Sequence, residues 1–209
     1  MYQFFILLLL GFITKVNAQY YYNDILSNKQ AKENYLLLKK NDIKKVTVTS
    51  YEPDGTPTEG FGISQEINAS KNEIITYTKS SMSPTSILLT SYLNSGYPSL
   101  TKDSTEASIS LTTYSYYDNI KYNISIIHYS THEPEKSAIQ FSEERRYNYD
   151  STHLKSMWRI KNNKDSLQVL FITDDHEQIV EERWVQKEKI IETYYYYYDV
   201  NNRLSDIVR

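Results

Sequence analysis

The sequence predicts an all-β, mainly antiparallel fold: a twisted meander of sequential hairpins with one amphipathic helix at its N-terminal end. From residue 44 onward, apolar and polar residues alternate in about 10–12 short runs, which is the period of half-buried strands. Short Asn- and Asp-rich segments separate these runs, whereas parallel strands would need much longer connections. Tyrosine, which favours strands, occurs 21 times in 209 residues.

The first 18 residues match a secretory signal peptide. An apolar core of about ten residues, Phe4 to Ile13, has the usual length of such a region and is too short to span a bilayer. Val16 and Ala18 supply small residues before the cleavage site, although no Lys or Arg precedes the core. The alternative is a buried or anchoring N-terminal helix. Cleavage would make Gln19 the first residue of an exported, periplasmic or extracellular protein.

Composition excludes several classes of protein. Loss of Lys15, one of 23 basic residues, leaves 22 against 26 acidic residues, so no basic surface for nucleic acid is expected. The absence of cysteine excludes a disulfide framework, a thiol nucleophile, Cys-bound zinc and lipidation at Cys. Leader and composition together favour the envelope of a Gram-negative bacterium. No second apolar stretch is long enough to cross a membrane after signal removal.

Residues 19–42 are expected to form an N-terminal segment with the helix. Ser27 and Gln30 have the spacing of a capping box, which marks a helix start. Ala31, Tyr35 and Leu38 follow at helical spacing, and the two leucines before Leu38 widen the apolar stripe. The two lysines after it suit the negative end of the helix dipole. This helix is predicted to cover the first strands of the sheet.

Residues 43–209 are predicted to form the meander, in a single domain with the helix. The segments 94–106 and 130–137 are expected to be longer loops. Because the chain has only five glycines, Asn and Asp are expected to supply the turn residues with positive φ. The alternating runs cover residues 46–51, 60–67, 73–79, 86–93, 107–117, 121–129, 138–149, 154–161, 167–173, 178–185, 190–198 and 203–208.

A weak internal repeat supports the hairpin interpretation. Residues 147–150 and 196–199 each end a Tyr-rich strand pattern with an Asp that can start a turn, and residues 114–118 begin a third, degenerate copy. This unit resembles the hairpin Y-x-Y-D-x-x-G-R-L-x-x-I of YD-repeat or RHS-like proteins. Asn202 stands where Gly is usual, and Arg203 keeps the next position of the unit.

Residues 19–24, 45–51 and 194–209 also resemble uncharacterised exported β-hairpin-repeat proteins of Gram-negative bacteria. This resemblance implies an exported location and a hairpin fold, and it implies no known activity. Such relatives extend beyond this point with further hairpins. The last strand is therefore expected to be an exposed edge open to association, or the sequence to be part of a longer chain.

Residues 194–198 are five consecutive tyrosines, so a strand there would place three rings on one face and two on the other. These rings could stabilise the sheet by cross-strand pairing, or they could contact a glycan, peptide or protein. We expect both tryptophans to be mostly buried. Trp184 should face the same side of its strand as Val180 and Glu182, and Ile179 should face the other side. The candidate contact residues are Tyr147, Tyr149, Trp158, Trp184, Tyr194, Tyr196 and Tyr198.

No catalytic, cofactor-binding or metal-binding residue can be assigned. His128 and His132 would lie about 13 Å apart on a strand, which is too far for a shared metal ion. His176 is expected in a solvated acidic turn. Within the doublets 143–144 and 181–182, adjacent glutamates would face opposite ways, so neither doublet alone forms an acid–base pair. No cofactor is expected.

Three functions remain open. The first is an exported, non-enzymatic β-repeat protein, structural or interactive, which presents a Tyr-rich surface to an envelope protein or a glycan. The alternative is a periplasmic carrier of a lipid or other apolar ligand, in a half-barrel capped by the N-terminal helix; this resembles the lipoprotein-carrier architecture at fold level. The third is an unrecognised hydrolase. A concavity lined by Leu, Ile and Phe would favour the carrier.

Overall fold

The computed structural model describes residues 20–81, 84–117, 123–136, 138–151 and 153–209, so the predicted signal peptide lies outside it. In these residues one helix, α1 (Tyr22–Lys40), precedes a sheet of thirteen strands in strict sequence order, with every neighbouring pair antiparallel. The predicted antiparallel meander with one N-terminal helix is confirmed. The strands are β1 (Lys45–Val48), β2 (Gly62–Asn68), β3 (Glu73–Lys79), β4 (Ser86–Tyr92), β5 (Pro98–Ser104), β6 (Ile109–Tyr116), β7 (Ile124–His132), β8 (Phe141–Asp150), β9 (His153–Lys161), β10 (Asp165–Thr173), β11 (Ile179–Gln186), β12 (Lys189–Tyr198) and β13 (Leu204–Val208).

The strand that the sequence did not predict is β5, which occupies most of the segment 94–106. The expected loop there is wrong: only a tight turn connects β4 to β5, closed by the Leu93 N–H donating to the Tyr97 carbonyl at 2.8 Å. Gly96 supplies the positive φ that this turn requires. Pro98 stands at the first position of β5, where its missing N–H is tolerated. Ser and Thr in the rest of the strand weaken the alternation that would have revealed it.

The start of α1 is the second correction. The helix begins at Tyr22, and Ser27 lies inside it with its hydroxyl donating to the Asn23 side chain at 3.2 Å. The capping box at Ser27 and Gln30 therefore does not form. The N-terminal end of α1 is instead held by Glu182 of β11, a residue that no local pattern could connect to it.

The buried stripe of α1 is narrow and partly polar. Tyr21, Asn28 and Tyr35 are buried at intervals of seven residues, so they form one ridge along the helix. The expected widening of the stripe is wrong, because Leu36 and Leu37 are exposed. Leu36 still packs beside the β4–β5 turn, since a Cβ built on Gly96 would meet its side chain at 2.8 Å.

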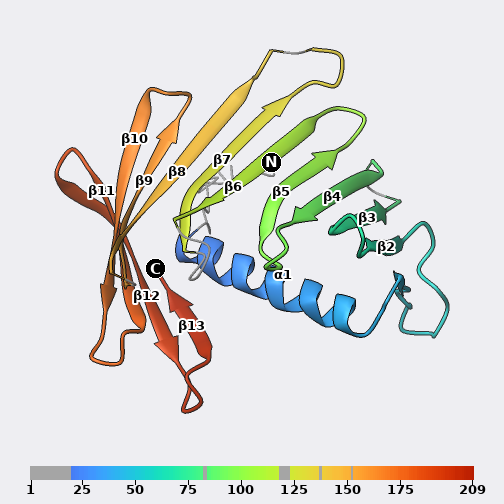
Figure 1. Cartoon of the computed structure of the whole chain (residues 1–209), viewed down its shortest axis with the longest axis horizontal. Helices are drawn as coiled ribbons and strands as arrows, with labels where there is room; N and C mark the ends of the chain where they lie inside the picture. Colours follow the sequence, from blue (N-terminus) through green and yellow to red (C-terminus); the bar gives the residue numbers. More distant parts are fainter. Residues whose placement is uncertain (1–19, 82–83, 118–122, 137, 152) are drawn as a thin grey trace, which may run out of the picture.

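The sheet bends around α1, which lies along its concave face (Figure 1). Tyr21 contacts β11 at one end of the helix, and the Tyr35 hydroxyl donates to Asn72, in the β2–β3 turn, at the other. These two tyrosines are separated by about 21 Å along the helix axis. Eight strand spacings, from β3 to β11, cover about 38 Å along the sheet. A flat sheet could not meet both ends of so short a helix. The edge strands β1 and β13 do not pair with each other, so the sheet stays open.

Two apolar clusters hold the helix to the sheet. The larger one packs Tyr20, Tyr22 and Ile25 against inward-facing side chains of strands β6–β13. The smaller one surrounds Tyr35, which is fully buried against Ile67 and Ile74 and stacks on Tyr92 with ring centroids 4.0 Å apart. The helix therefore covers strands at both ends of the sheet, whereas only the first strands were expected beneath it.

Five hairpins along one side of the sheet share a feature of register. In each, the second strand carries one extra residue, a β-bulge, with one or two residue pairs left before the turn. The first-strand residues at the bulges are Tyr92, Tyr116, Tyr149, Thr173 and Tyr198, which are 24, 33, 24 and 25 residues apart. The copies predicted around Tyr149 and Tyr198 thus belong to a longer structural series. Asp118 of the third predicted copy lies outside the described residues.

The turns after β10 and β12 have the same geometry. The Asp174 carboxylate accepts hydrogen bonds from the backbone N–H groups of His176 and Gln178, both at 2.9 Å. Asp199 does the same for residues 201 and 203, at 2.8 and 2.9 Å. The residue three positions after each aspartate has positive φ: Glu177 in one turn and residue 202 in the other. The expectation that Asn and Asp take positive φ in turns is thus right for Asn202 and wrong for Glu177, which takes this conformation without an Asn or Asp side chain.

Candidate functional site

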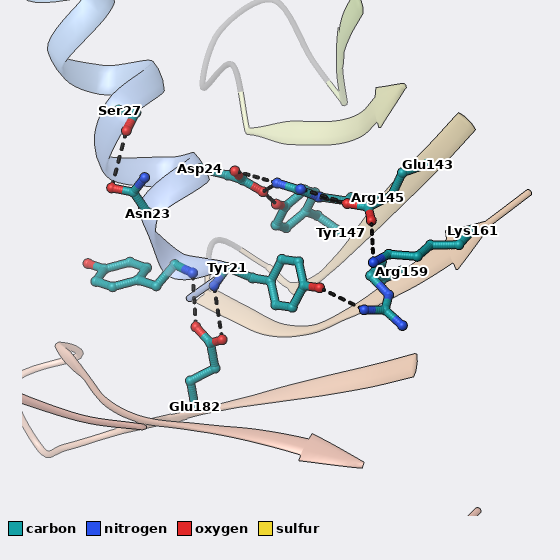
Figure 2. Close-up of polar contacts among 11 residues, drawn as sticks. Tyr21, Asn23, Asp24, Ser27, Glu143, Arg145, Tyr147, Arg159, Lys161 and Glu182 are labelled. Carbon is teal, nitrogen blue, oxygen red and sulfur yellow. Dashed lines mark hydrogen bonds and ion pairs between the residues drawn. The ribbon is translucent and has the colours of Figure 1, made fainter. Parts of the chain in front are cut away.

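An extensive polar cluster lies where the N-terminal end of α1 meets the sheet (Figure 2). At its centre Glu182 is fully buried. Its two carboxylate oxygens each accept a backbone hydrogen bond at 2.9 Å, from the N–H groups of Tyr21 and Tyr22. Trp184 Nε1 donates to Oε1 at 2.6 Å, and the Tyr196 hydroxyl donates to Oε2 at 2.7 Å. Four donors therefore replace the water that this carboxylate has lost.

The position of Glu182 suits its charge. The free N–H groups at a helix N-terminus carry a partial positive charge, and a carboxylate there is stabilised by it. Burial, followed by the negative charge of Glu182, raises the pKa of the Tyr196 hydroxyl well above its usual value. Tyr196 consequently stays protonated and acts as a permanent hydrogen-bond donor to Glu182.

A second cluster lies one turn further along α1. Asp24 accepts hydrogen bonds from Arg145 Nη1 with both carboxylate oxygens at 2.7 Å, and it accepts a third from the Tyr147 hydroxyl. Arg145 also donates from Nε to Glu143 Oε1 at 2.7 Å, and Lys161 Nζ lies 3.6 Å from the other oxygen of Glu143. Burial would lower the Arg145 pKa, but the charges of Asp24 and Glu143 raise it above its ordinary value.

These two clusters stabilise the packing of α1 on the sheet, and their carboxylates are already hydrogen-bonded within the chain. The buried carboxylates of Glu182 and Glu143 and the half-buried carboxylate of Asp24 are each occupied by several donors of the chain itself. In the ranges that the structure describes, no group of three or more His, Asp and Glu side chains lies close enough to hold a metal ion. The arrangement fixes the end of α1 against β8 and β11, and nothing in its geometry points to acid–base chemistry.

Two cavities flank the buried ridge of α1 on either side of Asn28, whose side-chain amide donates to the Tyr116 hydroxyl at 2.9 Å. The first, of about 320 Å³, is lined by Tyr22, Ile25, Tyr149, His153, Leu154 and Glu177 among others. The second, of about 330 Å³, is lined by Asp24, Thr90, Thr101, Tyr114, Tyr129 and Arg145 among others. Hydroxyl, amide and charged groups alternate with apolar ones in both linings, so neither resembles a site for an extended hydrocarbon chain.

The structure divides the predicted contact residues between two faces of the sheet. Tyr147, Trp184, Tyr194 and Tyr196 are buried under α1, and Tyr149 and Tyr198 are half-buried against the same core. Trp158 alone in this set is exposed, on the outer face; the expected burial is thus right for Trp184 and wrong for Trp158, whose neighbour Met157 takes the inward position.

The predicted division of the five consecutive tyrosines between two faces is confirmed. Tyr194 and Tyr196 are buried and Tyr198 is half-buried, all packed in the same core, whereas Tyr195 and Tyr197 are 45% and 52% exposed. The prediction that Ile179 faces away from Trp184 is wrong. Val180 is the extra residue of a β-bulge, which turns Ile179 back into the core that contains Trp184.

The sequence reasoning did not identify Glu182, Asp24 and Arg145 as a linked set. One signal was present: Glu143 and Arg145 are two residues apart on a strand and therefore share a face. The glutamate doublets do face both ways, because Glu143 and Glu182 are buried while Glu144 and Glu181 pair with arginines at the outer face. The partner residues on α1 are more than a hundred positions away, and spacing alone cannot reveal them.

Among the described residues, no helix is both long enough and apolar enough to cross a membrane. Comparison with known proteins adds no relationship: no protein-family model matches the chain, and no curated protein matches it significantly.

Proposed function

We propose that the chain is an exported, non-enzymatic binding module that contacts a component of the cell envelope through the outer face of strands β9–β13. The observation that carries this proposal is the exposure of Tyr195 and Tyr197 on a strand whose inward tyrosines are buried under α1. The concave face is occupied by the chain's own helix. The outer face is therefore the larger surface left for a partner.

Other exposed apolar side chains lie on the same face. Trp158 on β9 and Ile190 on β12 point outward, and Val208 on β13 pairs with Tyr195 across the strands. Clustered aromatic and aliphatic groups at a surface favour contact with a partner, and Trp and Tyr supply much of the binding energy at such contacts. We call Trp158, Ile190, Tyr195, Tyr197 and Val208 the outer aromatic face.

Sedimentation tests this proposal. The chain from Gln19 onward is mixed separately with peptidoglycan sacculi and with outer-membrane vesicles from the source bacterium. We expect it to sediment with one of them, and the double variant Tyr195→Ser/Tyr197→Ser to bind at least fivefold more weakly. Tyr51→Ser changes an exposed tyrosine outside this face and should bind normally. Failure of the unmodified chain to sediment with either fraction would refute the proposal.

The carrier remains a second candidate because the sheet is curved and cavities of about 320 and 330 Å³ flank the helix. These volumes lie at the lower end of the range for small-molecule sites. Against a lipid cargo stand the polar groups that line both cavities. Native mass spectrometry of protein purified from its own host distinguishes the two: a retained lipid supports the carrier, and a mass equal to that of the chain alone counts against it.

A further inference from the structure

We infer that a groove on the outer face, at the end of strands β9–β11, binds a neutral saccharide; this inference rests on the proposed binding role of that face and gives it a ligand class. The groove has a volume of about 440 Å³ and is lined by Trp158, Asp165, Gln168, Val185, Gln186 and Lys187 among others. Part of its floor is one row of side chains across three strands, because Trp158 pairs with Gln168 and Gln168 pairs with Val185.

Trp158 provides the platform. It is 44% exposed although indole is the largest apolar side chain, and Arg146 and Gln168 lie directly across from it on the neighbouring strands. A side chain at the centre of a sheet row has few alternative positions, so little conformational entropy is lost when a ligand binds. The ring face is apolar and electron-rich, and it matches the C–H face of a pyranose ring.

Polar groups lie on the same face beside Trp158. Gln168 pairs directly with Trp158, and Ser166, two residues away on β10, shares the outward register of Gln168; both line the groove. The Gln168 amide and the Ser166 hydroxyl provide both donors and acceptors near the indole. A sugar hydroxyl is also both donor and acceptor, so these groups suit it.

The charge of the groove selects among ligands. Lys164 and Lys187 are balanced by Asp165 and Glu188, so the lining has no net charge. A phosphate or a uronic acid polymer would need an excess of positive charge. An acyl chain would need a continuous apolar lining, whereas Trp158 and Val185 are surrounded by polar groups. A ligand with hydroxyl groups and no charge fits best.

Calorimetric titration with three neutral hexasaccharides, cellohexaose, maltohexaose and chitohexaose, tests the inference on the chain from Gln19 onward. We expect at least one of them to bind and to change tryptophan fluorescence. Trp158→Ala should weaken that binding at least tenfold, and Trp158→Phe should restore part of it. Hexagalacturonate, an acidic hexasaccharide, should bind at least tenfold more weakly than the best neutral one. Circular dichroism checks that each variant is folded, which is expected because the indole is exposed.

Tyr197→Ser is the matched control, because Tyr197 lies on the outer face but not in the groove lining. It should leave saccharide affinity unchanged. Binding of no neutral hexasaccharide, or equal affinity of the Trp158→Ala and unmodified chains, would overturn the inference. The two proposals can fail separately: sedimentation that depends on Tyr195 and Tyr197 without any saccharide binding would overturn only the ligand class, whereas absence of both would overturn both.

Discussion

At the scale of single residues, a carboxylate without exposed surface is tolerated only where hydrogen-bond donors replace its hydration. Glu182 meets this condition with two backbone N–H groups, an indole N–H and a phenol hydroxyl. Because two of these donors belong to the start of α1, the same side chain also fixes where the helix begins. One buried residue of β11 thus decides the position of an element 160 residues away.

Glu182→Gln should lower the free energy of unfolding by about 2–4 kcal/mol. The NH₂ group of the glutamine would face N–H and O–H donors that now donate to a carboxylate oxygen. Urea unfolding followed by circular dichroism measures this loss. The control is Glu181→Gln, whose carboxylate pairs with a partly exposed Arg183 and should contribute about 0–1 kcal/mol. Equal losses in the two variants would show that the four hydrogen bonds of Glu182 do not stabilise the fold.

At the scale of elements, aspartates stabilise two turns that are each followed by a β-bulge, and the bulge sets the register of the next strand. Asp174 holds two backbone N–H groups of its turn, and the β-bulge that follows places Ile179 in the core. Asp174→Ala should therefore destabilise the protein by about 1 kcal/mol, measured as a lower urea midpoint. Asp175→Ala, in the same turn and exposed, is the control and should have little effect. A smaller loss for Asp174→Ala than for Asp175→Ala would contradict this role.

The pH dependence of stability tests whether Asp199 stabilises its turn in the same way. Hydrogen bonds from Arg203 and from the turn backbone lower the pKa of the Asp199 carboxyl. Stability that depends on a lowered carboxyl pKa is present at neutral pH, and it is lost as pH falls from about 4 through the folded-state pKa. Asp199→Ala should accordingly reduce the urea midpoint at pH 7 and much less at pH 2.5. A difference between variant and unmodified chain that is the same at both pH values would refute the charge-dependent role.

Strand positions could be predicted wherever alternation was strong, as in residues 73–79 or 167–173, because one face of each strand must be buried. The strand β5 was missed because Ser and Thr occupy half-buried positions and Asp103 an exposed position in it, so apolar residues do not alternate with polar ones. The start of α1 was misplaced because its cap comes from Glu182, a tertiary partner. The exposure of Trp158 and the inward turn of Ile179 depend on register and bulges, which no single-strand pattern contains.

At the scale of the whole molecule, the core is unusually rich in phenol rings. Tyrosine rings from α1 and from strands β4, β6, β8 and β12 lie in the two apolar clusters, and several of their hydroxyls donate to carboxylates or carbonyls. Such a core is stable only while the phenols stay protonated, since a buried phenolate would lose both hydration and its role as donor. Burial is the largest cause of a raised pKa at Tyr20, Tyr21, Tyr92, Tyr114, Tyr116, Tyr147, Tyr149, Tyr194, Tyr196 and Tyr198.

Alkali should therefore unfold this protein cooperatively. In the unfolded chain tyrosine ionises near pH 10, whereas burial, and then the neighbouring Tyr35, raises the pKa of Tyr92 to about 12 in the fold. A raised folded-state pKa means that stability is complete below pH 10 and falls as pH rises toward 12, by at most about 1.4 kcal/mol per pH unit for each such ring. Urea unfolding at intervals from pH 8 to 12 measures this slope.

Tyr92→Phe keeps the ring that stacks on Tyr35 but cannot ionise, so its slope between pH 10 and 12 should be shallower than that of the unmodified chain. Below pH 9 the two chains should differ by a constant amount, because neither ionises there in the folded or the unfolded state. Parallel slopes up to pH 12 would show that Tyr92 ionises without cost in the fold. A free energy of unfolding that does not change over the whole range would show that the protonated phenol core is not what limits stability in alkali.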